Sequence, residues 1–285
     1  MTELIVGLSG HIDHGKTSII KSLTDEFSGT LKEDDLRGMT VDLGIAFLND
    51  KITLIDVPGH QDFIKNMLSG VQSIDLGLLV IAADDGIMPQ TKDHFNILKL
   101  LNVSNIIILI NKIDLVDSDM LELVKLEISD LLIDSKYENA DILEISTIKK
   151  IGIKRLKEKL ENYNYDTKNS SGPFRMPIDR IFSIKGFGTV VTGTVTSGSI
   201  KLGKEVKIEP ISKLAKIRGI NTHNSSSTNI SIGQRAAINL QNIDKQDIKR
   251  GYQLVEKDFF RPSFSIIAEI QILNVIQNPL KRNQE

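Results

Sequence analysis

Short apolar runs alternate with helix-like segments over residues 1–168. Each run is continuously apolar rather than alternating, which is typical of strands buried on both faces of a sheet. Strands separated by helices predict a doubly wound α/β domain with a mostly parallel sheet. The five runs expected to form its strands are Leu4–Leu8, Ile52–Val57, Leu78–Ala82, Ile106–Ile110 and Ile142–Ile145.

The pattern changes after the polar segment Tyr163–Gly172, which we interpret as a linker. Residues 173–258 carry short β-branched runs broken by regularly placed glycines, and this pattern predicts a small β-barrel. Residues 261–285 include the strand-like run FSIIAEIQIL but are too few for a domain. We interpret them as the remnant of an incomplete second barrel, and we expect its open strand edges to pack poorly.

Composition narrows the possible classes of protein. The 285 residues carry a formal net charge of only −2 and no cysteine. A generally basic nucleic-acid-binding protein is therefore excluded, as are disulfides and cysteine-ligated zinc. The N-terminus lacks the pattern of a signal peptide, and the longest apolar stretch, Leu76–Ala83, is too short to span a membrane. We expect a cytoplasmic monomer without membrane contact.

A phosphate-binding pattern follows the first predicted strand. Residues 10–17 fit G-x-x-x-x-G-K-[ST] at every fixed position and precede a helix-like segment. Glycines let backbone N–H groups turn inward around phosphates, Lys16 would reach the β- and γ-phosphates, and the Thr17 hydroxyl would bind Mg²⁺. The alternative is a chance match, which the strand-then-helix context makes rare. The phosphate-binding candidates are Gly10, His11, Ile12, Asp13, His14, Gly15, Lys16, Thr17, Ser18 and Gly59.

A second motif, D-V-P-G-H, begins at Asp56 and follows the apolar run Ile52–Ile55. A carboxylate at the end of a buried strand beside a phosphate loop is placed to hold the Mg²⁺ shell. Gly59 has no side chain to block its backbone N–H from a γ-phosphate. A simple turn is the alternative, since the motif alone is weak, and its position downstream of the phosphate loop favours function.

A third motif, N-K-I-D, follows the predicted strand Ile106–Ile110. The Asp114 carboxylate can accept two hydrogen bonds from the N1–H and amine of guanine, a donor pair that adenine lacks. Asn111 and Lys112 complete the motif, and Lys112 can lie along the base. The alternative is a turn whose aspartate caps a helix. Ser146-Thr147 follows the last predicted strand and is a weaker candidate for the base edge, with a cap nearly as plausible.

In this order and spacing, the three motifs and Arg37-Gly38-Met39-Thr40 resemble translational GTPases. The resemblance implies GTP and GDP as ligands with Mg²⁺ held by Thr17, Thr40 and Asp56. It also implies that Lys16, Thr40 and His60 are catalytic, with His60 acting on the attacking water. Ile12 and Met39 are similar to the apolar pair that keeps this histidine from the water until the ribosome reorders the site.

Among translational GTPases the chain resembles the selenocysteine-specific elongation factors. Three sequence segments carry this likeness: residues 37–44, RGMTVDLG; residues 174–201, at the start of the barrel; and residues 233–240, GQRAAINL. The likeness implies an α/β GTPase domain followed by a translation-factor β-barrel that holds the aminoacyl end of selenocysteinyl-tRNA. Our candidates for that pocket are Arg180 and Arg235, because cationic groups favour an ionised selenol, together with Asp179. The alternative is that they are rim charges or barrel salt bridges.

The same likeness implies the ribosome as a partner, with GTP hydrolysis as the release switch. An mRNA hairpin would be bound only by domains that this chain does not contain. The chain departs from the family at Thr147, where alanine is usual, and at Asp34 and Asp35, where relatives tend to be basic. Three alternatives stay open: a general aminoacyl- or initiator-tRNA carrier, a metabolic regulatory GTPase, and a truncated GTP-binding fragment without delivery activity. The phosphate-loop sequence, GHIDHGKT, counts against the metabolic class, whose members typically carry a different phosphate loop.

Overall fold

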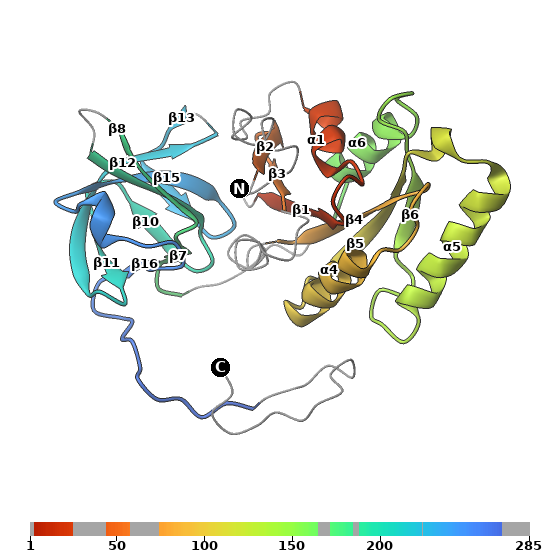
Figure 1. Cartoon of the computed structure of the whole chain (residues 1–285). Helices are drawn as coiled ribbons and strands as arrows, with labels where there is room; N and C mark the ends of the chain where they lie inside the picture. The colour runs from red at the N-terminus through yellow and green to blue at the C-terminus, as the bar shows by residue number, and fades with distance from the viewer. Residues whose placement is uncertain are drawn as a thin grey trace.

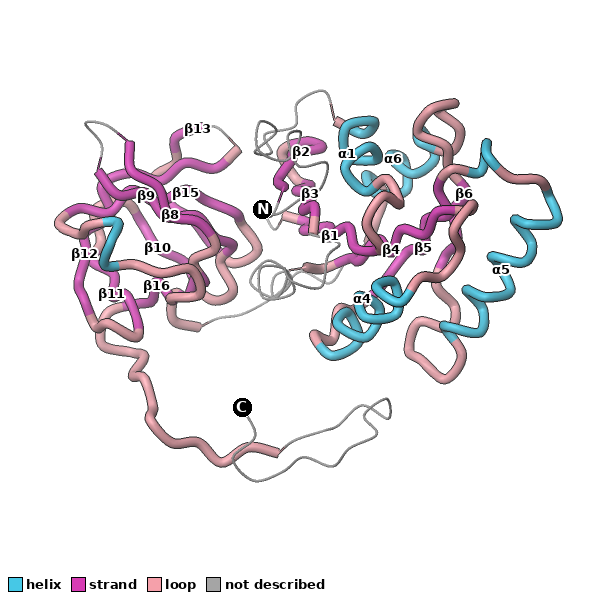
Figure 2. Tube along the Cα trace, viewed as in Figure 1, coloured by secondary structure: helices cyan, strands magenta, loops and turns pink. Residues whose placement is uncertain are grey.

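The computed structural model describes residues 3–24, 44–57, 74–164, 172–184, 188–223 and 225–269. An α/β domain comes first and a domain of β-strands follows it (Figure 1). All described helices of eight or more residues belong to the first domain, as the colouring by secondary structure makes plain (Figure 2). The predicted α/β domain followed by a β-barrel is therefore confirmed.

The first domain is built on a six-stranded sheet in the order β2-β3-β1-β4-β5-β6. Neighbouring strands are parallel, except that β2 runs antiparallel to β3. The strands are β1 (Leu4–Gly10), β2 (Gly44–Asn49), β3 (Ile52–Asp56), β4 (Leu76–Ala82), β5 (Asn105–Asn111) and β6 (Asp141–Glu144). All five predicted strands are present. Strand β2 was not predicted, because an edge strand carries only a short apolar run that does not stand out in the sequence.

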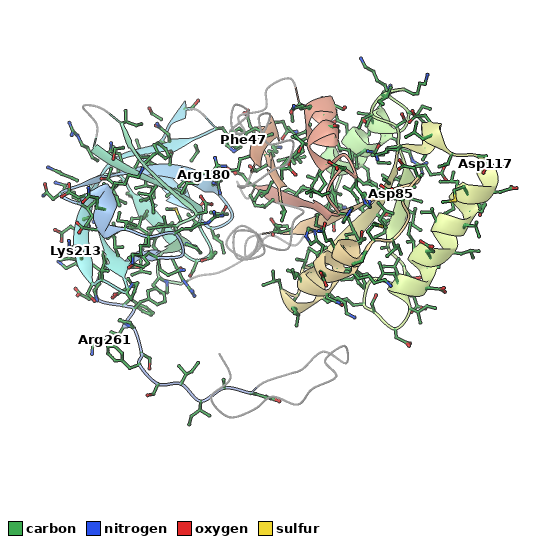
Figure 3. The ribbon with its side chains drawn as sticks, viewed as in Figure 1. Phe47, Asp85, Asp117, Arg180, Lys213 and Arg261 are labelled. Atoms are coloured by element: carbon green, nitrogen blue, oxygen red, sulfur yellow. The ribbon has the colours of Figure 1, made fainter. Side chains whose placement is uncertain are left out.

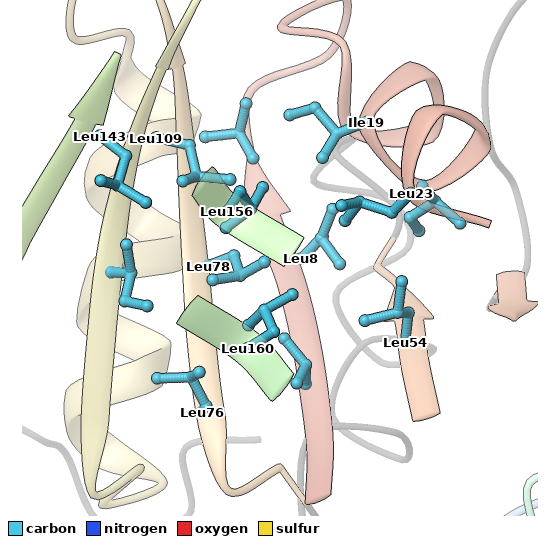
Figure 4. Close-up of a cluster of buried hydrophobic side chains, with 14 of the residues drawn as sticks. Leu8, Ile19, Leu23, Leu54, Leu76, Leu78, Leu109, Leu143, Leu156 and Leu160 are labelled. Atoms are coloured by element: carbon cyan, nitrogen blue, oxygen red, sulfur yellow. The ribbon is translucent and has the colours of Figure 1, made fainter. Parts of the chain in front are cut away.

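Helices cover both faces of this sheet because side chains alternate along each strand. On β1, Leu4, Val6 and Leu8 join the core under α1 and α6, whereas Ile5 joins the opposite core under α4 and α5. The first of these cores is packed with leucine and isoleucine side chains (Figure 4). Truncating one such leucine to alanine would cost about 2–5 kcal/mol. The helices are α1 (Lys16–Leu23), α4 (Pro89–Leu100), α5 (Ser118–Leu132) and α6 (Ile153–Glu161).

The carboxyl ends of the parallel strands meet at one edge of the sheet, where ligands bind in open α/β folds. Between β1 and α1, residues 11–15 form a tight turn at this edge. Asp56 is the last residue of β3 and Asn111 the last of β5, so the three motifs converge on this one edge.

The second domain is an antiparallel sheet in the order β7-β16-β11-β12-β15-β9-β8, accompanied by the pair β10-β14. Alternate residues such as Val206 and Ile208 on β11 point into one buried core that also contains Phe174 and Met176. Its strands are β7 (Arg175–Pro177), β8 (Arg180–Ile184), β9 (Gly188–Thr194), β10 (Ser199–Lys201), β11 (Glu205–Glu209), β12 (Lys213–Thr222), β13 (Ser225–Ser226), β14 (Asn229–Ser231), β15 (Arg235–Gln241) and β16 (Gln253–Glu256).

The segment after β16 corrects one sequence expectation. The run FSIIAEIQIL predicts a strand, but its described part, residues 264–269, forms none. Phe264 and Ile267 are fully exposed, so no neighbouring strand or apolar surface covers them in the part of the chain that the structure describes. A strand pattern without a partner for its backbone groups does not make a stable strand.

Candidate functional site

The loop between β1 and α1 owes its shape to glycine. Gly10 (φ 136°) and Gly15 (φ 89°) both adopt backbone conformations that side chains disfavour. A side chain on Gly10 would also collide with the carbonyl oxygen of Val80, and one on Gly15 with the amide of Asn111. The loop therefore closes tightly at the N-terminus of α1, where unpaired backbone N–H groups favour an anion.

Lys16 lies buried inside this loop. Its Nζ donates hydrogen bonds to the carbonyl oxygens of Gly10 (2.9 Å) and His11 (2.6 Å). Burial lowers the pKa of Lys16 to about 8, although the carboxylates of Asp56 and Asp13 partly oppose that shift. A bound phosphate would raise this pKa again, because it places negative charge beside the ammonium group.

The Thr17 hydroxyl and the Asp56 carboxylate meet at the mouth of the loop. Thr17 Oγ1 donates to Asp56 Oδ2 over 2.5 Å, and Asp56 is fully buried. Both are hard oxygen donors of the kind that Mg²⁺ prefers, and Mg²⁺ is usually held by one or two protein groups plus substrate phosphates. The chemistry of the pair fits that ion.

A cavity of about 260 Å³ continues from the loop toward β5. Asn111 Nδ2 donates to the carbonyl oxygen of His14 (3.0 Å), so the third motif braces the phosphate loop. Lys112 adopts a left-handed backbone (φ 61°), and its Nζ lies 3.2 Å from Asp84 Oδ2. The residues that line the cavity are Asp13, Gly15, Ser18, Asn111, Lys112, Asp114, Leu115, Thr147 and Ile148.

The structure separates the two residues of the Ser146-Thr147 pair. Thr147 lines the cavity, whereas Ser146 is buried and its Oγ accepts a hydrogen bond from the Lys149 N–H at 3.0 Å. Ser146 therefore shapes the turn that presents its neighbour. Of the predicted residues, Thr40, Gly59 and His60 lie outside the described ranges, as do Arg37 and Met39.

Two buried histidines support the phosphate loop, one within it and one on α4. His14 is fully buried, and burial lowers its pKa to about 4 although its Nε2 lies 3.6 Å from Asp85 Oδ2. Asp85 lies near the strand ends that carry the loop (Figure 3). His94 on α4 accepts a hydrogen bond from the Gly10 N–H, and sequence analysis missed it because its motif neighbours are 84 residues away.

A larger cavity, of about 740 Å³, lies between β2 and the barrel. Ile45 and Phe47 line it from β2, and Arg180, Arg218 and Arg235 line it from the barrel. Phe47 and Arg180 lie where the two domains face each other (Figure 3). One cavity wall thus comes from the strand that follows the resemblance-implied switch, residues 37–44.

Asp179 and Arg235 form a buried ion pair at this cavity. Arg235 donates through both terminal nitrogens, at 2.6 and 2.9 Å, and Thr192 Oγ1 adds a hydrogen bond of 2.7 Å to Asp179. The salt-bridge alternative therefore applies to these two candidates. Asp179 therefore compensates the charge of Arg235, and Arg180, the first residue of β8, lines the same cavity.

A second contact joins the two domains beside the cavity. The buried Glu3, just before β1, lies 2.9 Å from His223 Nε2 at the end of β12, and the Phe47 ring lies 4.5 Å from the His223 ring. The Glu3 carboxylate raises the pKa of His223, since it stabilises the charged imidazole. These contacts place the barrel against the strands that carry the phosphate loop.

Comparisons with known proteins agree with this geometry. Residues 2–166 match the Elongation factor Tu GTP binding domain, and residues 188–255 match Elongation factor Tu domain 2. The selenocysteine-specific elongation factor of Desulfomicrobium baculatum is 41% identical over 288 residues, covering 99% of this chain and 45% of that protein. The chain thus spans about half the length of the curated relatives it matches.

Solved structures give the same similarity. A bacterial selenocysteine-specific elongation factor, EF-Sec, superposes with a TM-score of 0.82 at 33% identity, over 90% of this chain and 45% of that one. Elongation factor SelB from Methanococcus maripaludis, in complex with the GTP analogue GppNHp, gives 0.80 at 34% identity, over 90% and 56%. No described helix has the length and apolar character to cross a membrane.

Proposed function

The chain belongs to the translational GTPases that share the elongation factor Tu GTP-binding domain, and on that premise we propose that it is a GTP-dependent carrier of selenocysteinyl-tRNA. Hydrolysis of GTP to GDP and phosphate on the ribosome would release the tRNA. The observation that carries the proposal is that one sheet reaches both sites. Its strand β1 leads into the phosphate loop, and its strand β2 lines the arginine-containing cavity.

The phosphate loop binds the nucleotide through backbone N–H groups and Lys16. On binding, the Lys16 ammonium exchanges the carbonyl oxygens of Gly10 and His11 for phosphate oxygens. Those carbonyls hold the ammonium in place beforehand, so little reorganisation is needed. Phosphoryl transfer depends mainly on such positioning and on charge stabilisation.

Thr17 and Asp56 would hold Mg²⁺, joined by Thr40 in the GTP state. The bound ion would neutralise charge on the β- and γ-phosphates. His60 orients the attacking water. Ile12 and Met39 keep the His60 side chain away from that water until the ribosome reorders the site. These roles for Thr40, His60 and Met39 come from the family resemblance.

Asp114, Lys112 and Thr147 bind guanine in the 260 Å³ cavity. The carboxylate accepts from N1–H and the amine, and adenine would leave it buried without these donors. Asn111 acts indirectly, because its amide holds the phosphate loop against β5.

The aminoacyl end occupies the 740 Å³ cavity. A selenol is ionised near neutral pH whereas the serine hydroxyl is not, so Arg180 favours selenocysteine. The Asp179–Arg235 pair has a supporting role, because its bidentate geometry holds Arg235 in place in the cavity wall. Phe47 and Ile45 line the cavity from β2. A change in the conformation of the preceding switch segment would therefore alter the shape of the aminoacyl site.

The test is protection of the aminoacyl ester. The purified chain with Mg·GTP would be mixed with selenocysteinyl-tRNA, and separately with seryl-tRNA on the same tRNA body. Slower hydrolysis of the selenocysteinyl ester alone supports the proposal. Equal protection of both esters would favour the general carrier, and protection of neither, with nucleotide bound, would favour a GTP-binding fragment without delivery activity.

A further inference from the structure

Helix α4 contacts the phosphate loop at two points one helical turn apart. The Gly10 N–H donates to His94 Nδ1 at 2.7 Å, and the Ile12 N–H lies 3.4 Å from Gln90 Oε1. We propose that His94 is a positioning residue of the nucleotide site, which fixes the first turn of the phosphate loop by accepting the Gly10 N–H. The inference rests on the proposed nucleotide site and adds a residue that none of its motifs contains.

The chemistry of His94 suits this role. Its side chain is 1% exposed, and burial, with the charge of Lys16, lowers its pKa to about 3. The imidazole is therefore neutral at working pH. Because Gly10 supplies the proton of the hydrogen bond, Nδ1 must be the acceptor, and the ring carries its own proton on Nε2.

His94 and Lys16 hold Gly10 from its two sides. The Gly10 N–H donates to His94, and the Gly10 carbonyl accepts from Lys16 Nζ. When a phosphate takes the Lys16 ammonium, the carbonyl loses this partner and His94 remains as the fixed support. Gly10 needs such support because its backbone (φ 136°) has a wide range of alternatives.

A histidine can also be buried simply to fill space, and three substitutions separate the two roles. In His94→Asn, Oδ1 stands where Nδ1 stood and can accept the same N–H. In His94→Gln the acceptor lies one bond further out, and in His94→Leu there is none. All three replacements are uncharged, so they differ chiefly in where the acceptor lies.

The matched control is Thr91→Val on the same helix. Thr91 is fully buried, and its hydroxyl has no hydrogen-bond partner among the described residues. This isosteric change alters a buried side chain three residues before His94 and removes no side-chain hydrogen bond found in the described structure.

The experiment measures dissociation constants and dissociation rates of GDP and GTP for each variant, with thermal unfolding in parallel. His94→Asn and Thr91→Val should stay within about 3-fold of the parent, whereas His94→Leu and His94→Gln should bind about 10-fold more weakly, since a buried N–H loses its acceptor. Equal affinities for the Asn and Gln variants, or tight binding by the Leu variant, would overturn the proposal. If the Leu variant does not fold, the Asn–Gln contrast decides. A parent that fails to bind GDP would instead refute the proposed function.

Discussion

Replacing one carboxylate oxygen at the base site should exchange one nucleotide specificity for another. Asp114, on the short 3₁₀ turn Ile113–Leu115, lines the 260 Å³ cavity together with Thr147. In Asp114→Asn the side-chain amide keeps one acceptor but presents an N–H₂ donor to guanine, whose facing groups are both donors. Xanthine carries a carbonyl in place of the guanine amine, so it matches the new pattern.

The magnitude follows from the hydrogen bonds that change. A hydrogen bond to a charged group contributes about 1.5–3 kcal/mol, so weakening two of them costs about 3–6 kcal/mol. At 1.4 kcal/mol per tenfold change, GDP affinity should fall about 10²–10⁴-fold. Xanthosine diphosphate should become the preferred ligand of the variant.

The assay is calorimetric titration of parent and variant with GDP, ADP and xanthosine diphosphate. Asp117→Asn is the matched control, because it makes the same chemical change three residues away and outside the cavity lining. Asp117 is the N-cap of α5, where its carboxylate accepts a hydrogen bond from the Met120 N–H at 2.9 Å. Asparagine caps helices about as well, so this control should keep both stability and specificity. Undiminished GDP binding by Asp114→Asn, with none gained for xanthosine diphosphate, would refute our account of the base site.

Three further changes test other parts of the structure. His60→Ala should bind GTP normally and lose ribosome-stimulated hydrolysis in a phosphate-release assay; unchanged turnover would remove His60 from the mechanism. The pKa of His94 is lowered to about 3 from 6.5, so the unfolded chain binds a proton that the folded chain excludes, and stability falls as the pH falls below about 6.5. At pH 4.5 this costs about 2–3 kcal/mol, and denaturant unfolding of His94→Asn should lack that loss; identical acid profiles would contradict it. Asp179→Ala should destabilise the chain by about 3–5 kcal/mol, because the buried Arg235 loses its counter-ion, whereas Asp247→Ala, at an exposed pair, should leave the unfolding midpoint almost unchanged; equal effects would show that burial of the pair is unimportant.

The parts of the fold that the sequence predicts are those set by local patterns. Continuous apolar runs mark strands buried on both faces, and the phosphate-loop spacing marks the turn between β1 and α1. A strand pattern fails over residues 264–269, because a strand also needs a neighbour and none lies there in the described structure.

Contacts between residues distant in sequence are harder to predict. Asp179 and Arg235 appear in the sequence as separate pocket candidates. Only the folded barrel shows that β9, which lies between β15 and β8, brings Arg235 of β15 and Asp179 just before β8 into one ion pair. His94 meets Gly10 across 84 positions, and Glu3 meets His223 across the domain boundary. No local pattern specifies such partners, because the packing of whole elements decides them.

The central claim is that the nucleotide governs tRNA binding in this chain. Its most direct test is the rate of selenocysteinyl-ester hydrolysis measured with Mg·GDP and with a non-hydrolysable GTP analogue on the same preparation. The account predicts strong protection with the GTP analogue and little with GDP. Equal protection in both nucleotide states, or protection that does not require nucleotide, would contradict it.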